Sequence, residues 1–115
     1  MTAYSYRAKV IRWVDGDTVW LDVDLGFRMR SQAPFRLYGI DTPEIGQPGR
    51  NEATAAAAAM APAGAEVSIN SYKNPDKYGR WLVDVVTHDS MGSVNARLVI
   101  AGHAVSYFGG VRTPA

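Results

Sequence analysis

The chain has 115 residues, of which 47% are hydrophobic and 20% charged, and its formal net charge is +1. No run of about 18 apolar residues occurs, which excludes a membrane-spanning helix, and the length predicts one domain over residues 1–115 with a loose tail over 109–115. The absence of cysteine excludes disulfides, thiolate metal ligands and thiol nucleophiles. The small net charge disfavours a wide duplex-DNA footprint, so an anionic ligand is expected at a local site.

The basic residues are nine arginines and three lysines, and arginine holds phosphate or carboxylate by two points, which lysine cannot do. Arg7 and Lys9 lie where a secretory signal would need its apolar segment. We therefore expect a cytoplasmic monomer without membrane association, with secretion by a leader outside this sequence as the alternative.

The first half of the chain predicts three strands and a helix. Strands are expected over 5–14 and 17–25, joined by a tight turn at Asp15-Gly16, which is a strong hairpin signal. The second strand places four aliphatic side chains on one face, which predicts that this face lies in a core: Val19, Leu21, Val23 and Leu25.

A third strand is expected over 31–40. An alanine-rich helix follows over 50–60, capped by Asn51 or a residue just before it and ended by Pro62. Strands over 66–72 and 80–87 and a short helix over 93–101 complete the chain. Five strands with a helix between the third and the fourth predict a mainly β, α+β fold, a five-stranded OB-fold barrel with two or three short helices; a two-layer α+β sandwich has the same element count.

Two aspartates end up on core-facing positions if side chains alternate regularly along their strands. These are Asp17, at the start of the second strand, and Asp41, at the end of the third. A core-facing carboxylate is costly to ionise unless a cation or a donor meets it. With Glu44, the two aspartates would form an oxygen cluster of the kind that calcium prefers. Each stretch alone also fits a plain structural role. Asp15-Gly16 fits a hairpin turn, and residues 36–44 fit a strand followed by a turn in which Asp41 or Thr42 acts as a cap.

Basic side chains flank these carboxylates in the sequence. Alternation places Arg36 on the face opposite Asp41, so a bend near Gly39 is needed to bring the two together. Residues 76–80 supply Lys77, Tyr78 and Arg80 within one loop, a set that suits a phosphate beside a base or sugar. A turn with solvated charges is the alternative interpretation of that loop.

Four motifs now stand in order: Asp-Gly-Asp-Thr-Val from residue 15, Phe-Arg-Leu-Tyr-Gly-Ile-Asp-Thr-Pro-Glu from residue 35, Asp-Lys-Tyr-Gly-Arg from residue 76, and Val-Asn at residue 94. From about residue 10 to residue 107 the sequence resembles the staphylococcal nuclease (thermonuclease) family. The resemblance implies an OB-fold barrel and calcium-dependent hydrolysis of phosphodiester bonds in DNA and RNA. Members of that family usually continue into a further long helix, whereas this sequence stops at Ala115.

The resemblance also implies roles for individual residues. The implied calcium ligands are the carboxylates of Asp17 and Asp41 and the backbone carbonyl of Thr42. The implied catalytic residues are Arg36 and Arg80, on the scissile phosphate, and Glu44, near the attacking water. The implied nucleotide-binding residues are Lys77 and Tyr78, near another phosphate, and Tyr107, an aromatic near the base for which Phe108 is an alternative. A catalytically weak or inactive OB-fold module that binds nucleic acid is the rival hypothesis, and the presence of every one of these acidic and basic residues favours the enzyme.

Overall fold

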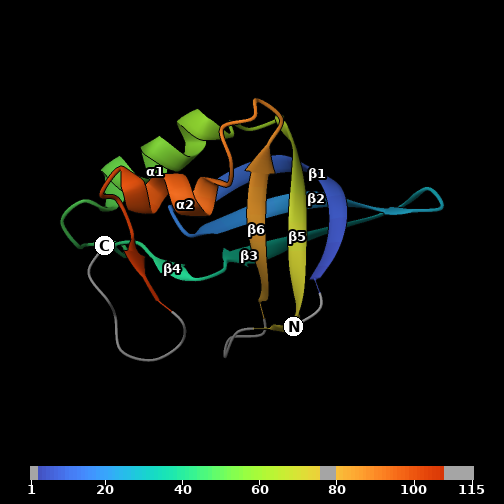
Figure 1. The fold of residues 1–115 in the computed structure, drawn as a ribbon, viewed down its shortest axis with the longest axis horizontal. Helices are drawn as coiled ribbons and strands as arrows, with labels where there is room; N and C mark the ends of the chain where they lie inside the picture. The colour runs from blue at the N-terminus through green and yellow to red at the C-terminus, as the bar shows by residue number, and fades with distance from the viewer. Residues whose placement is uncertain (1–2, 76–79, 108–115) are drawn as a thin grey trace.

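The computed structural model describes residues 3–75 and 80–107. Five of its strands form a closed barrel in the order β1-β2-β3-β6-β5, so the predicted mainly β, OB-type fold is confirmed (Figure 1). The strands of the barrel are β1 (Ala3–Asp15), β2 (Thr18–Gly26), β3 (Met29–Leu37), β5 (Glu66–Pro75) and β6 (Trp81–Thr87).

The barrel is closed by one short seam. The β1–β2, β2–β3, β1–β5 and β5–β6 pairs are antiparallel, whereas β3 and β6 are parallel and pair only from Phe35↔Trp81 to Leu37↔Val83. This seam brings the end of β3 beside the start of β6. Residues that are far apart in the sequence, Arg36 and Arg80, therefore reach the same region of the surface.

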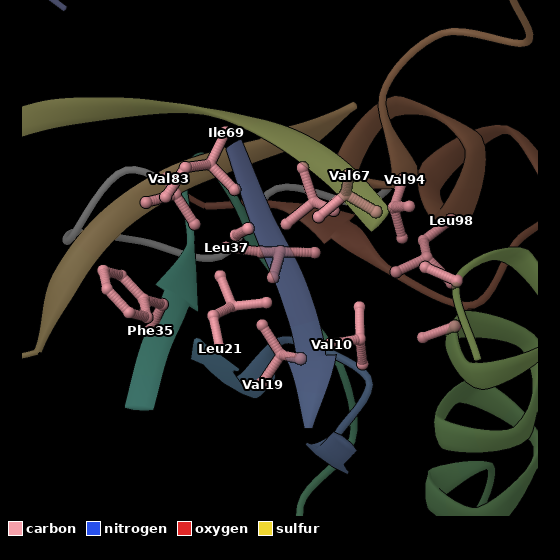
Figure 2. Close-up of a cluster of buried hydrophobic side chains, with 14 of the residues drawn as sticks. Val10, Val19, Leu21, Phe35, Leu37, Val67, Ile69, Val83, Val94 and Leu98 are labelled. Atoms are coloured by element: carbon pink, nitrogen blue, oxygen red, sulfur yellow. The ribbon is translucent and has the colours of Figure 1, made fainter. Parts of the chain in front are cut away.

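The core fills the inside of this ring with aliphatic side chains (Figure 2). Val19, Leu21 and Val23 are buried as the alternation of β2 predicts, and Leu37, Val67 and Val85 meet them from other strands. The prediction for Leu25 is wrong, because this side chain is 42% exposed. The β2–β3 hairpin projects beyond the barrel at this point, so its inner face has no opposing strand to cover it (Figure 1).

Two helices, α1 (Arg50–Met60) and α2 (Val94–Ile100), lie together at one end of the barrel. The bounds of α1 agree with the sequence prediction, but its N-cap is Gly49 at φ 86°, without a side-chain cap hydrogen bond, and Asn51 lies inside the helix. Ala53 and Ala57 are fully buried, because alanine allows the helix to approach the strands closely. Neither helix of the described chain has the length and apolar character needed to cross a membrane.

The predicted third strand divides in two. β3 ends at Leu37, a turn follows, and β4 (Ile40–Asp41) pairs with β7 (Val105–Ser106) instead of joining the barrel. Gly39 lies at this turn with φ 78°, a left-handed conformation that glycine adopts without steric cost. The bend expected near Gly39 is thus present, and it directs the chain out of the barrel toward the C-terminal segment.

Asn95 fastens this turn to the barrel. It is 4% exposed at the start of α2, its Oδ1 accepts from the Val85 N–H at 3.1 Å, and its Nδ2 donates to the carbonyls of Tyr38 at 3.0 Å and Val83 at 3.1 Å. One amide side chain thereby connects α2, β6 and the β3–β4 turn.

Asn95→Ala leaves these buried backbone groups without their partners, and we expect it to lower the free energy of unfolding by about 1–3 kcal/mol or more. Chemical denaturation monitored by circular dichroism measures this loss. Asn51→Ala, on the exposed side of α1, is the control and should change stability by less than about 0.5 kcal/mol. Equal effects of the two substitutions would show that Asn95 is not a fastening residue.

A tyrosine on the outside of the barrel is coupled to a carboxylate. The Tyr72 hydroxyl donates to Asp84 Oδ2, and the Tyr72 and Tyr38 ring centroids are 4.3 Å apart. The hydrogen bond to Asp84, followed by burial and by the negative charge of Asp84, raises the pKa of Tyr72 to about 12.

The raised pKa of Tyr72 predicts a loss of stability in alkali. The folded protein keeps the phenol proton up to about pH 12, whereas the unfolded chain releases it near pH 10.0, so the stabilising contribution is complete below pH 10 and declines as the pH rises toward 12. Urea unfolding of the wild type and of Tyr72→Phe across this range tests the expectation. The difference between the two proteins should shrink with rising pH, and a constant difference would contradict it.

Candidate active site

The turn between β1 and β2 packs against two other parts of the chain. A Cβ atom at Gly16 would lie 3.0 Å from the Thr42 side chain and 3.2 Å from the Ala53 Cβ atom in α1. Only glycine allows so close an approach without displacing its neighbours. The absence of a side chain at this position brings the next residue, Asp17, against Thr42.

The Asp17 carboxylate is buried and surrounded by donors. Its Oδ1 accepts from the Thr18 hydroxyl at 3.1 Å, and its Oδ2 accepts from the Thr42 N–H at 2.9 Å and lies 3.0 Å from Arg36 Nη1. The side chain is only 9% exposed. A buried carboxylate remains ionised at moderate cost only when it is paired and hydrogen-bonded, and these donors meet that requirement.

Arg36 connects the two predicted metal carboxylates. Its Nη1 pairs with Asp17 at 3.0 Å and its Nη2 with Asp41 Oδ1 at 3.3 Å, while its side chain is 11% exposed. The prediction that Asp41 lies on the core face is wrong, because Ile40 takes the buried position of β4 and is 4% exposed. The turn at Gly39 interrupts the regular alternation of side chains, and the Asp41 carboxylate therefore lies beside Arg36. Arg36 itself keeps the outward position that alternation along β3 predicts.

A second guanidinium reaches Asp17 indirectly. Arg80 lies directly before β6, and its Nη1 donates to the Thr18 hydroxyl at 3.2 Å. The same hydroxyl donates to Asp17. The site therefore joins two carboxylates and two guanidinium groups whose formal charges balance.

Glu44 does not join this group. It is exposed on the loop before α1, where its N–H donates to Gln47 Oε1 at 2.8 Å. Within residues 3–75 and 80–107, no three acidic, histidine or cysteine side chains are grouped as a metal would require. The predicted three-carboxylate cluster is therefore not formed, because Glu44 belongs to a loop shaped by Gln47 and not to the strand that carries Asp41.

Thr42 is 2% exposed and follows β4. Its hydroxyl oxygen is buried and has no hydrogen-bond partner among the described residues. This unsatisfied oxygen, together with two carboxylates that one guanidinium spans, is a set of hard oxygen donors of the kind that suits calcium. The donor chemistry therefore fits the implied metal.

The predicted nucleotide-binding residues are placed only in part. The N–H of Tyr107, which follows β7, donates to the Gly39 carbonyl at 2.9 Å. Tyr107 thus lies beside the turn that positions Asp41. Lys77 and Tyr78 lie outside the described residues.

One contact near the site was missed from the sequence. Arg50, the first residue of α1, pairs with Asp15 at 2.9 Å and also donates to the Val14 carbonyl. A cation at a helix N-terminus interacts unfavourably with the helix dipole. The presence of Arg50 at this position therefore indicates a carboxylate from outside the helix that offsets this cost. This contact holds α1 against the turn that carries Asp17.

Residues 34–114 match the family described as staphylococcal nuclease homologue. The chain belongs to that family. A relative from Mycoplasma genitalium, named Uncharacterized lipoprotein MG186, is 38% identical over 80 residues, which is 57% of this chain and 30% of the relative. The chain thus spans less than a third of the length of this relative.

The donors around Asp17 predict a large effect of its removal. Asp17→Ala removes the carboxylate partner of Arg36 Nη1 and of the Thr42 N–H, while Arg36 Nη2 keeps its pair with Asp41. We therefore expect a loss of unfolding free energy near the lower end of about 3–5 kcal/mol. Asp22→Ala removes a more exposed ion pair with Arg30 and should cost less than about 1 kcal/mol. Urea denaturation measures both values, and similar losses in the two variants would mean that the Asp17 contacts contribute little.

Proposed function

We propose that this protein is a calcium-dependent nuclease that hydrolyses phosphodiester bonds of DNA and RNA. The observation that carries the proposal is the convergence of Arg36 and Arg80 on the Asp17 side chain, the first directly and the second through Thr18. Membership of the staphylococcal nuclease homologue family supports it.

A phosphodiester is an anion with a poor leaving group, so catalysis needs positive charge at its oxygens and a water aligned for attack. Arg36 and Arg80 would bind the non-bridging oxygens of the phosphate, and their forked donors strengthen as charge develops there. Arg36 would then exchange its present carboxylate partners for phosphate oxygens. Arg80 already donates to the neutral hydroxyl of Thr18, and a phosphate oxygen would take the place of that acceptor.

Asp17, Asp41 and the main chain or hydroxyl of Thr42 would hold the metal. When bound, calcium supplies positive charge that polarises the phosphate and orients water. Glu44 is assigned to accept or orient the proton of the attacking water. Its exposed loop position leaves its carboxylate accessible from solvent. Lys77, Tyr78 and Tyr107 are assigned to the nucleotide, and the partner is DNA, RNA or both.

The test is cleavage of single-stranded DNA, duplex DNA and RNA with calcium and with a chelator. The wild type should cleave only with calcium, and zinc should not replace it, because the assigned ligands are hard oxygens. Nucleic acid that is retarded in a gel but left intact under both conditions would favour the binding module instead.

Arg80→Lys separates catalysis from binding. Lysine keeps the positive charge but loses the fork, so kcat should fall by about 10²–10³ while KM changes little. Arg97→Lys is a matched control, since Arg97 Nη1 donates to the Thr87 hydroxyl at 3.1 Å much as Arg80 Nη1 does to Thr18. A change in KM alone, or an effect equal to that of Arg97→Lys, would remove Arg80 from the catalytic residues.

A further inference from the structure

The outer face of β2 and β3 continues from the site with side chains that the proposed reaction does not use. Thr18 pairs with Arg36 in the antiparallel register, and Trp20 pairs with Pro34. Because side chains two residues apart share a face of a strand, Trp20 and Pro34 lie on the same face as Thr18 and Arg36, about 7 Å further along. Trp20 is half-buried, and no other outward-facing position of the described strands β2 and β3 carries an aromatic residue.

A bulge in β1 directs an arginine toward this tryptophan. Val10 pairs with Leu21, but Arg12 pairs with Trp20, so that Ile11 is the extra residue of β1. Regular alternation would point Arg12 to the same side as the buried Val10, whereas the bulge turns it outward. Bulges of this kind redirect side chains and are common beside active sites.

The result is a cationic and aromatic pair at the surface. The Arg12 guanidinium carbon lies 5.4 Å from the centroid of the Trp20 ring, and Arg12 is exposed. Further along the same face, Asp22 is paired with Arg30 at 3.0 Å. The Arg12–Trp20 pair therefore places a cation and an aromatic ring one step along this face from Thr18 and Arg36.

We propose that Arg12 and Trp20 form a subsite for the nucleotide next to the scissile phosphate of a single-stranded substrate. The indole stacks on the base, and the guanidinium moves from the ring to the adjoining backbone phosphate. Stacking on an aromatic residue accepts any base but requires that the base be unpaired. The subsite therefore selects single strands over duplexes without selecting a sequence. This assignment rests on the proposed function, because it places the scissile phosphate at Arg36 and Arg80.

Binding without cleavage tests the subsite. The probe is a fluorescein-labelled short oligothymidylate in chelator-containing buffer, and the measurement is fluorescence anisotropy at two salt concentrations. Trp20→Leu should raise the Kd about tenfold, the size of effect seen when a base-stacking aromatic is removed. Trp20→Phe should restore most of the affinity. Arg12→Ala should weaken binding and reduce its salt dependence by about one ion contact.

Two comparisons keep a structural explanation apart from the proposed one. Tyr4→Leu removes another exposed aromatic of the barrel, 45% exposed and on β1 at Ser71 of β5, and should leave the Kd unchanged. Binding of a blunt duplex of the same length should be weak and equal in the wild type and Trp20→Leu. An unchanged oligothymidylate Kd in Trp20→Leu, or an equal loss of affinity for duplex and single strand, would overturn the subsite.

Binding and cleavage measured together separate a failure of the subsite from a failure of the nuclease proposal. A wild type that binds oligothymidylate through Trp20 but never cleaves it with calcium supports the subsite and refutes the nuclease function. A wild type that cleaves, with Trp20→Leu binding as the wild type does, supports the nuclease function and refutes the subsite.

Discussion

The burial of the Asp17 carboxylate is the constraint on which the arrangement of the site depends. An ionised group that is 9% exposed needs donors, and these come from three segments: Thr18 in β2, Arg36 in β3 and Thr42 after β4. Their contacts therefore connect the segment after β4, which lies outside the barrel, to the paired ends of β2 and β3. Gly16 makes this possible, because any side chain there would separate the turn from Thr42 and α1.

Local signals in the sequence were sufficient for most of the fold. The period of two in β2 predicted Val19, Leu21 and Val23 as core residues, and the alanine-rich segment before Pro62 gave α1 its bounds. The signals failed where an element depends on distant residues. β7 is two residues long and exists only because β4 pairs with it, so no periodicity within its own segment could reveal it. Leu25 follows the alternation of β2, but no other strand covers it at the projecting hairpin.

The candidate site was predictable in its residue types and less so in its geometry. Asp17 and Asp41 stand out because a core-facing charge is rare and needs partners, and Arg36 and Arg80 stand out through the motifs that contain them. Extending regular alternation through Gly39 placed Asp41 on the wrong face, because a left-handed residue at φ 78° interrupts the strand. Glu44 lies three residues after Asp41 in the sequence. It belongs to a loop in which its N–H donates to Gln47, whereas Asp41 lies in β4 and pairs with Arg36.

The departures from ordinary local rules gather around one turn. The buried carboxylate of Asp17, the unsatisfied hydroxyl of Thr42 and the cation Arg50 at a helix N-terminus all surround it, and such departures are expected where function has been favoured over stability. Arg36 pairs with both carboxylates, so a cation or a phosphate that bound alone would have to compete with these ion pairs. A divalent cation would bind the carboxylates of Asp17 and Asp41 in place of Arg36. The Arg36 guanidinium would then be available to bind a phosphodiester. On the proposed function, either ligand breaks the ion pairs of Arg36 with Asp17 and Asp41, and the other ligand then binds without that cost. The cation and the phosphodiester should therefore bind with positive coupling.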